Sequence, residues 1–211
     1  MTAPTTGLRA RAKQERLARI RAAAARLFSE QGYEATTTKE IAEVAEVGEA
    51  TLFRYVEGKH ELLLLVLGEQ MDQVIRTIQE QDRDRAGRAT TAQDHLERIY
   101  ALYRSRADFY ATDPEGVLNY MQYGFTAGSR LGAEGVRQGD EVIALTASIL
   151  DQARDQQLLR SDTDSQAVAQ NCNAIYIHEV LRSPVRQVVP GEMASRLHRR
   201  LAAQLEPLLP H

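Results

Sequence analysis

The stretch 37–59 constrains the fold most, because its pattern is typical of two short helices joined by a tight turn. Thr37 can cap the first helix, and Glu40 follows at the three-residue spacing of a capping box. Small apolar residues recur at helical spacing over 41–45, which suits two helices that cross closely. Gly48 then interrupts the pattern and relieves the backbone at the corner. We therefore expect a helix-turn-helix unit here.

The second helix of the pair is expected over 49–56, with Leu52 and Val56 turned inward. Its outer side carries hydroxyls, aromatic rings and an arginine, namely Thr51, Phe53, Arg54 and Tyr55. A helix of this kind can lie in the major groove of DNA, read base edges and grip phosphates at its flanks. The composition of this surface indicates a recognition helix.

Apolar spacing elsewhere predicts helices and no pair of strands, so we expect an all-α fold of about nine helices. Two segments interrupt the pattern: a charged connector over 82–90, and a glycine-rich stretch over 124–139 that is expected to be irregular. The other expected helices cover about 13–31, 59–81, 91–108, 114–123, 141–157, 164–183 and 192–208.

Composition excludes several classes of protein. The 211 residues are 43% hydrophobic and 26% charged, as in ordinary globular proteins. No apolar run approaches the roughly 20 residues of a membrane helix, and the N-terminus lacks an apolar signal core, so we expect a cytoplasmic protein. The single cysteine, Cys172, excludes an intrachain disulfide and is expected to pack as a small apolar residue.

Charge is distributed unevenly along the chain. The whole chain has a net charge of −3, yet residues 1–60 carry +2 and residues 61–211 carry −5. Within 8–26 there are seven positive side chains and one negative side chain. A basic N-terminal arm of this kind favours phosphates, although a solvated helix face would give the same pattern.

The spacing of residues over 14–67 resembles the DNA-binding domain of the TetR family of bacterial regulators. The resemblance rests on three groups of positions that keep the family's order and spacing. They are Ala25, Leu27, Phe28, Gly32, Tyr33, Thr36 and Thr37; then Ile41, Ala42 and Ala45; then Thr51, Leu52, Phe53, Tyr55 and Lys59.

The resemblance implies a two-domain homodimer that binds a palindromic operator and is released by a small ligand, with repression as the default. It implies a disordered basic arm (1–12), a helix-turn-helix domain (13–58) and a ligand-binding and dimerisation domain (59–211). Helices 164–183 and 192–208 would pair with those of a partner. On this basis we expect Leu201→Glu, in the leucine stripe of the last helix, to break the dimer.

The resemblance also implies which residues face DNA. Hydroxyls and Lys59 would contact phosphates, while Arg54 would read guanine or hold the backbone. Phe53 would contact a thymine methyl group and Tyr55 would offer its hydroxyl to a phosphate, unless both rings pack against the first helix instead. The full set is Thr37, Thr38, Lys39, Glu49, Ala50, Thr51, Phe53, Arg54, Tyr55 and Lys59.

Three residues depart from the family pattern at the turn and at the start of the recognition helix. Glu46 stands where glycine is usual, Gly48 replaces a capping serine, and Glu49 stands where a basic or amide residue is common. Glu49 would either accept from a cytosine amino group or serve only as a favourable charge at a helix N-terminus. A carboxylate near phosphates weakens binding, so the alternative is a helical sensor with weak or lost DNA binding.

Aromatic residues gather where the ligand domain is expected, since seven of the twelve Phe and Tyr residues lie between 100 and 125. Such rings form the walls of a cavity for a hydrophobic or aromatic effector, or simply fill the core. The predicted ligand-binding set is Tyr103, Phe109, Tyr120, Met121, Tyr123, Phe125, Asn171 and Tyr176. No motif for catalysis, metal binding or a cofactor is found, so we expect neither an enzyme nor a cofactor.

Overall fold

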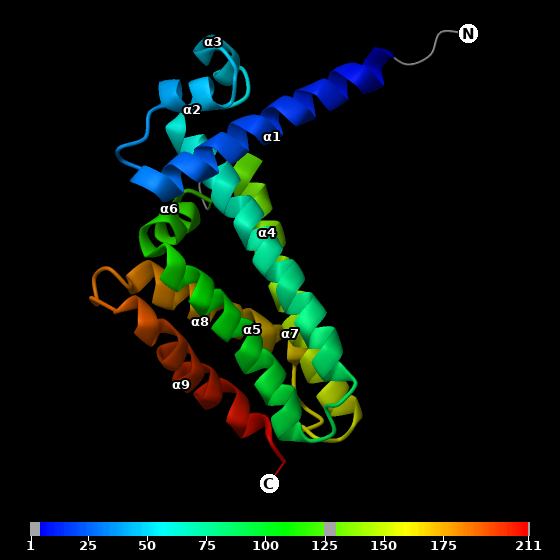
Figure 1. Ribbon diagram of the computed structural model, residues 1–211. Coiled ribbons are helices and arrows are strands. Elements are labelled where there is room, and N and C mark those ends of the chain that lie inside the picture. Colours follow the sequence, from blue (N-terminus) through cyan, green and yellow to red (C-terminus); the bar gives the residue numbers. More distant parts are fainter. Residues whose placement is uncertain (1–4, 125–129, 211) are drawn as a thin grey trace. The chain divides into compact units, whose positions relative to one another are not determined.

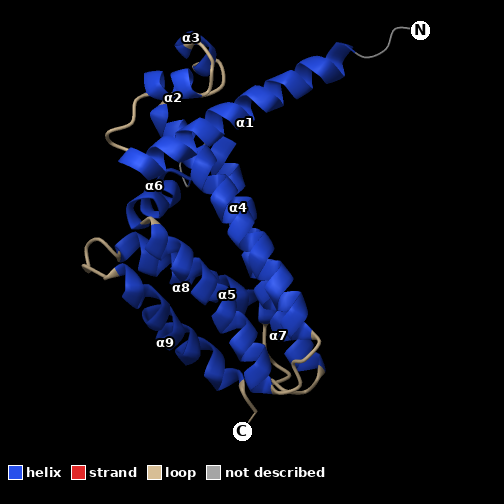
Figure 2. Ribbon diagram, in the orientation of Figure 1, coloured by secondary structure: helices blue, strands red, loops and turns tan. Residues whose placement is uncertain are grey.

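The computed structural model describes residues 5–124 and 130–210, and within them every regular element is a helix (Figures 1 and 2). The all-α prediction of about nine helices is confirmed. The α-helices are α1 (Thr5–Gln31), α2 (Thr38–Val44), α3 (Glu49–Leu52), α4 (Lys59–Ala86), α5 (Ala92–Thr112), α6 (Pro114–Gly124), α7 (Arg130–Asp155), α8 (Ser165–Arg182) and α9 (Met193–Leu205). Two short 3₁₀ helices, η1 (Pro190–Glu192) and η2 (Glu206–Leu208), flank α9.

The chain divides into two compact units, Met1–Glu69 and Gln70–His211. The division falls inside α4, about three helical turns beyond the predicted boundary at residue 58. The reason is that Leu62 and Val66, on the first turns of α4, are buried in the core of the first unit. The first unit therefore includes the first turns of α4 as well as α1, α2 and α3.

The core of the first unit consists of side chains that the spacing placed inward. Ile20 and Ala24 of α1, Ile41 of α2 and Leu52 of α3 have no solvent exposure. Val56, after α3, is 2% exposed. Burial of large aliphatic side chains contributes about 1.5–3 kcal/mol each, so this cluster holds the helix pair against α1.

Helix α1 begins at Thr5, whereas we expected a disordered arm over 1–12 and a helix from residue 13. The segment 5–12 contains alanine, leucine and arginine, which favour helix. Arg11 also forms an ion pair with Glu15 one turn later, with Nε and Oε1 3.0 Å apart. Local propensity therefore extends the helix well beyond the residues that pack on the core.

The leucine stripe of α9 lies inside its own protomer. Leu197, Leu201 and Leu205 are at most 1% exposed and belong to the core of the second unit, where α9 packs on α5 and α8. The expectation that Leu201 faces a partner is therefore wrong. The charge of Leu201→Glu would enter the core of the single chain. A dimer through α8 and α9 would have to use their outward residues instead.

Two segments that we expected to be irregular are largely helical. Helix α7 starts at Arg130, so residues 130–139 are helical despite three glycines. Helix α4 runs to Ala86 and includes half of the predicted connector. There Asp82 accepts two hydrogen bonds from the buried Arg98, at 2.8 and 2.9 Å, and this pairing explains why a charged segment stays ordered.

Candidate functional site

The N-terminus of α2 carries the predicted capping box. The Thr37 hydroxyl oxygen accepts from the backbone N–H of Glu40 at 3.2 Å, and the Glu40 carboxylate accepts from the Thr37 N–H at 2.8 Å. The Thr37 hydroxyl also donates to this carboxylate, and these bonds lower the pKa of Glu40. The cap satisfies N–H groups that would otherwise be free and fixes the direction in which α2 begins.

The starts of α2 and α3 are linked by one side-chain bond. The Thr38 hydroxyl donates to the Glu49 carboxylate at 3.0 Å, and both side chains lie at the N-terminus of their helix. Glu49 is therefore engaged within the protein, in a position where the helix dipole also favours a negative charge. This supports the structural interpretation of Glu49 over the specific contact with cytosine.

The recognition segment is shorter as an α-helix than predicted. Helix α3 ends at Leu52, and residues 53–55 continue as turns in which the N–H groups of Arg54 and Tyr55 bond to carbonyls three residues back. Phe53 is 48% exposed and Arg54 is also exposed, as expected for side chains that face outward. The outward side chains therefore lie both on the exposed side of α3 and in the turn that follows it.

Tyr55 and Lys59 have partners inside the first unit. The Tyr55 hydroxyl accepts from Arg16 Nη1 at 3.2 Å, and its ring packs against the core. The Lys59 ammonium donates to the carbonyls of Tyr33 and Glu34 at 2.9 and 3.2 Å, so it holds the loop between α1 and α2. Both residues serve packing, and their predicted contacts with phosphate stay predictions.

The turn between α2 and α3 contains a strained residue. Glu46 has φ of +54°, in the left-handed region, which explains why glycine is usual at this position. Its carboxylate is exposed and lies 3.7 Å from Arg19 Nη1. The strained backbone of Glu46 is therefore accompanied by only one weak ion pair.

The second unit contains a cavity of about 180 Å³. Four aliphatic or thioether side chains contribute its apolar walls: Met71 and Ile75 from α4, Ile143 from α7 and Ile177 from α8. Three buried polar side chains also line it, namely Arg106, Gln138 and Asn173. The mixture of apolar walls and a few polar groups is typical of a site for a small molecule.

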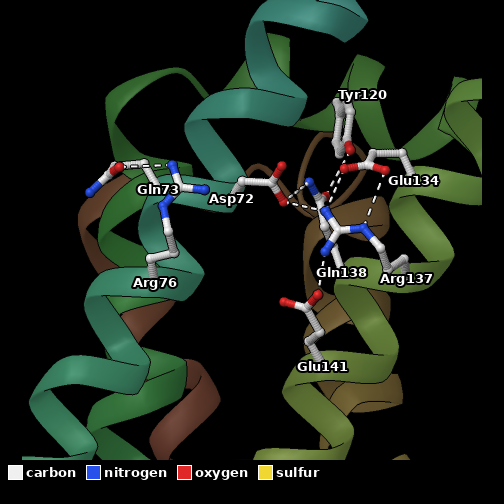
Figure 3. A network of polar contacts seen from close by, with 8 residues as sticks. All are labelled: Asp72, Gln73, Arg76, Tyr120, Glu134, Arg137, Gln138 and Glu141. Carbon is white, nitrogen blue, oxygen red and sulfur yellow. Dashed lines mark hydrogen bonds and ion pairs between the residues drawn. The ribbon is translucent and has the colours of Figure 1, made fainter.

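Two of the residues that line this cavity, Tyr120 and Gln138, belong to a polar network (Figure 3). The Tyr120 hydroxyl donates to Gln138 Oε1 at 2.8 Å, and Gln138 Nε2 donates to Asp72 at 2.9 Å. Arg137 bonds the same carboxylate at 2.6 Å and also pairs with Glu134 and Glu141. Burial raises the pKa of Tyr120 to about 12, so its hydroxyl stays protonated as a donor.

The first unit is similar in sequence to a known family of proteins. A family model described as "Bacterial regulatory proteins, tetR family" matches residues 20–66, which include α2, the turn and α3. The fold of the chain is also that of solved TetR-family regulators. The chain therefore resembles TetR-family regulators in residues 20–66 and in its fold. Its curated relatives are described as HTH-type transcriptional regulators.

Among solved structures, FadR of Thermus thermophilus, a TetR-family repressor in complex with lauroyl-CoA, is 26% identical. The match covers 92% of this chain and 95% of that chain, with a TM-score of 0.67. Two curated relatives match over shorter stretches. The regulator YvkB of Bacillus subtilis is 51% identical over 51 residues, 24% of this chain, and the transcriptional activator FasR of Mycolicibacterium smegmatis is 31% identical over 104 residues, 49% of this chain. The chain spans 27% and 44% of their lengths.

The predicted ligand residues fall into three groups. Tyr120 and Met121 line the cavity. Tyr103 and Tyr176 are fully buried in the core, and Phe109 packs against it, as the alternative of core filling expected. Asn171 is exposed and does not line the cavity, and the side chain of Tyr123 and all of Phe125 lie outside the described residues.

Sequence reasoning missed Arg106, whereas Asn173 stood out as a possible ligand contact on the helix from 164. Arg106 follows Tyr103 by three residues and precedes Tyr110 by four, so it occupies the inward face of α5. An arginine among inward aromatics was the available signal. Cys172 is fully buried as predicted, and burial raises the pKa of its thiol to about 12.

Within the described residues, no helix is long and apolar enough to cross a membrane. No group of three or more metal-ligating side chains was found in that part of the chain.

Proposed function

We propose that the chain is a ligand-responsive repressor that binds a palindromic operator as a homodimer and is released by a small hydrophobic effector. The observation that carries this proposal is the outward surface of α2 and α3. Lys39, Ala50, Phe53 and Arg54 are exposed there, while the residues between them are fixed by the capping box and the core. A rigid scaffold with free outward side chains is what reading DNA requires.

The cavity of the second unit supports the effector part of the proposal. Because Thermus thermophilus FadR binds lauroyl-CoA and is similar over nearly the whole chain, acyl compounds are the first class to test. Asp72 of α4 belongs to the network beside the cavity, and α4 is one continuous helix from the first unit to the second. We infer that a ligand that moves Gln138 or Arg137 also shifts α4, because both side chains bond to Asp72.

The experiment is selection of bound DNA from a genomic pool, followed by titration of the selected site at several salt concentrations. A regulator that contacts Z phosphates gives a slope of about −0.9Z in log affinity against log salt concentration. Acyl-CoA compounds are then added to the complex, and release is measured by fluorescence anisotropy. Selection of no sequence, together with a flat salt dependence, would contradict the proposal.

The second candidate is a helical sensor without DNA binding, favoured by the carboxylates of Glu46 and Glu49 near the reading surface. Both carboxylates have partners in the structure, Arg19 and Thr38, which reduces their effect on DNA without removing their charge. The same salt titration separates the two candidates, because a sensor of this kind has no phosphate contacts to lose.

A further inference from the structure

Arg106 is a buried cation at the wall of the cavity. Its residue is 5% exposed, and its Nη1 donates to Asn173 Oδ1 at 2.8 Å. The guanidinium carbon lies 3.7 Å from the ring centre of Tyr176 and 5.7 Å from that of Tyr103. These rings and one amide oxygen are neutral, so they stabilise the charge only in part.

The charge of Arg106 is not compensated by a carboxylate. Its Nε has no hydrogen-bond partner, and among the residues described here it forms no ion pair. Asp140 also lines the cavity but is exposed and not within ion-pair distance. Burial of an unpaired charge is costly, so a buried cation of this kind needs an anion.

Two other buried charged residues of the second unit, Arg98 and Glu179, have partners of opposite charge. Arg98 is 3% exposed and forms two hydrogen bonds with Asp82. Glu179 is 1% exposed and pairs with three arginines, Arg186, Arg196 and Arg200. Arg106 differs from both in having no opposite charge within ion-pair distance among the described residues.

Asn173 adds a second donor beside Arg106. Arginine only donates hydrogen bonds, so the amide oxygen of Asn173 must face it and the amide nitrogen Nδ2 must face elsewhere. Nδ2 forms no hydrogen bond with a described residue, and Asn173 lines the same cavity. The residues that line the cavity therefore include a guanidinium group and an amide N–H that has no partner among the described residues.

We propose that the cavity binds an apolar carboxylic acid, with its carboxylate against Arg106 and Asn173 and its chain along Met71, Ile75, Ile143 and Ile177. This deepens the proposed function, on which it rests, by naming the class of effector. The volume of about 180 Å³ slightly exceeds the roughly 150 Å³ of an engineered apolar cavity that takes benzene, so a medium-length chain or one ring fits. A neutral alcohol of the same length lacks the charge that Arg106 requires.

The test is calorimetric titration of the full chain with octanoate, octan-1-ol and octanoyl-CoA, without DNA. Octanoate is expected to bind about 10- to 100-fold more tightly than octan-1-ol, because hydrogen bonds between charged groups contribute more than neutral ones. Arg106→Met should remove this preference and leave octan-1-ol binding nearly unchanged. Arg106→Lys should keep part of it, since the charge stays and the fork of donors is lost.

Arg104→Met is the matched control, because Arg104 lies on the same helix but is exposed. It should bind all three compounds as the unchanged chain does. Thermal unfolding checks that Arg106→Met folds, and an apolar replacement of a buried charge is often neutral or stabilising. Arg106→Lys provides the comparison if the methionine variant does not fold.

Three results would overturn the inference. They are equal affinity for octanoate and octan-1-ol, an unchanged preference for octanoate in Arg106→Met, or tight binding of octanoyl-CoA alone with an affinity that Arg106→Met does not change. Release of DNA is measured separately on the selected operator. If octanoate binds through Arg106 but DNA is not bound or released, the proposed function fails and the cavity assignment stands. If DNA is released by octanoyl-CoA while the acid shows no preference, the assignment fails and the proposed function stands.

Discussion

Replacement of Glu46 by glycine should stabilise the first unit. A left-handed backbone costs a residue with a β-carbon about 1–2 kcal/mol, and Glu46 has φ of +54°. Glycine avoids this strain but loses more backbone entropy on folding, about 0.5–1 kcal/mol. The expected net gain for Glu46→Gly is therefore about 0.5–1 kcal/mol in the free energy of unfolding.

Glu46→Ala separates the backbone effect from the charge. Alanine keeps the β-carbon and the strain but removes the carboxylate and its ion pair with Arg19. The Glu46 side chain is 86% exposed, and an exposed pair of this kind contributes about 0–1 kcal/mol. Glu46→Ala should therefore be neutral or slightly destabilising, while both variants lose the same charge near DNA.

The assay is urea denaturation of the unchanged chain and both variants, followed by circular dichroism and compared at equal slopes. Glycine should exceed alanine by about 0.5–1 kcal/mol or more. Affinity for the selected operator at low salt should rise equally in the two variants. Equal stabilisation by both substitutions would refute the argument from backbone strain, because charge alone would then explain the gain.

Four further predictions concern other features. Lys39→Ala should make the salt slope of DNA binding shallower by about 1 without changing stability, whereas Lys59→Ala should also lower stability because its ammonium holds the carbonyls of Tyr33 and Glu34. Asp82→Ala should cost about 3–5 kcal/mol in urea denaturation by leaving Arg98 unpaired, and Asp82→Ala with Arg98→Met should recover much of it. Burial, and to a lesser degree Arg98, lowers the pKa of His95. Below about pH 6.5 the unfolded chain therefore binds a proton at His95 that the folded chain does not bind. The free energy of unfolding should fall as the pH drops below this value, and less so in His95→Gln. Ala174→Glu, on the exposed side of α8, should lower the mass in solution measured by light scattering, and Ala111→Glu on α5 should not; an unchanged mass would contradict dimerisation through α8.

The first unit could be predicted closely because its signals are local. Thr37 and Glu40 form a capping box that depends on spacing alone, and Leu52 and Val56 are buried as their periodicity required. The left-handed turn at Glu46 was visible only as a departure from a glycine position. The partners of Tyr55 and Lys59 come from α1 and the following loop, and no local pattern specifies them.

The cavity was harder to predict because it depends on contacts between distant helices. Arg106 and Asn173 are 67 residues apart, and their bond follows from the packing of α5 and α8. Glycine propensity also misled us over 130–139, where packing of α7 on its neighbours overrides the local preference. Aromatic residues marked the correct region, but most of the rings that could be placed fill the core.

The hydrogen bond between Thr38 and Glu49 has a consequence for how such a protein changes its operator. Each residue begins one of the two helices, so a substitution at either leaves the other without its partner. Attempts to graft the recognition residues of another regulator onto this chain should exchange positions 38 and 49 together, because a single exchange alters the start of both helices before it alters any contact with a base.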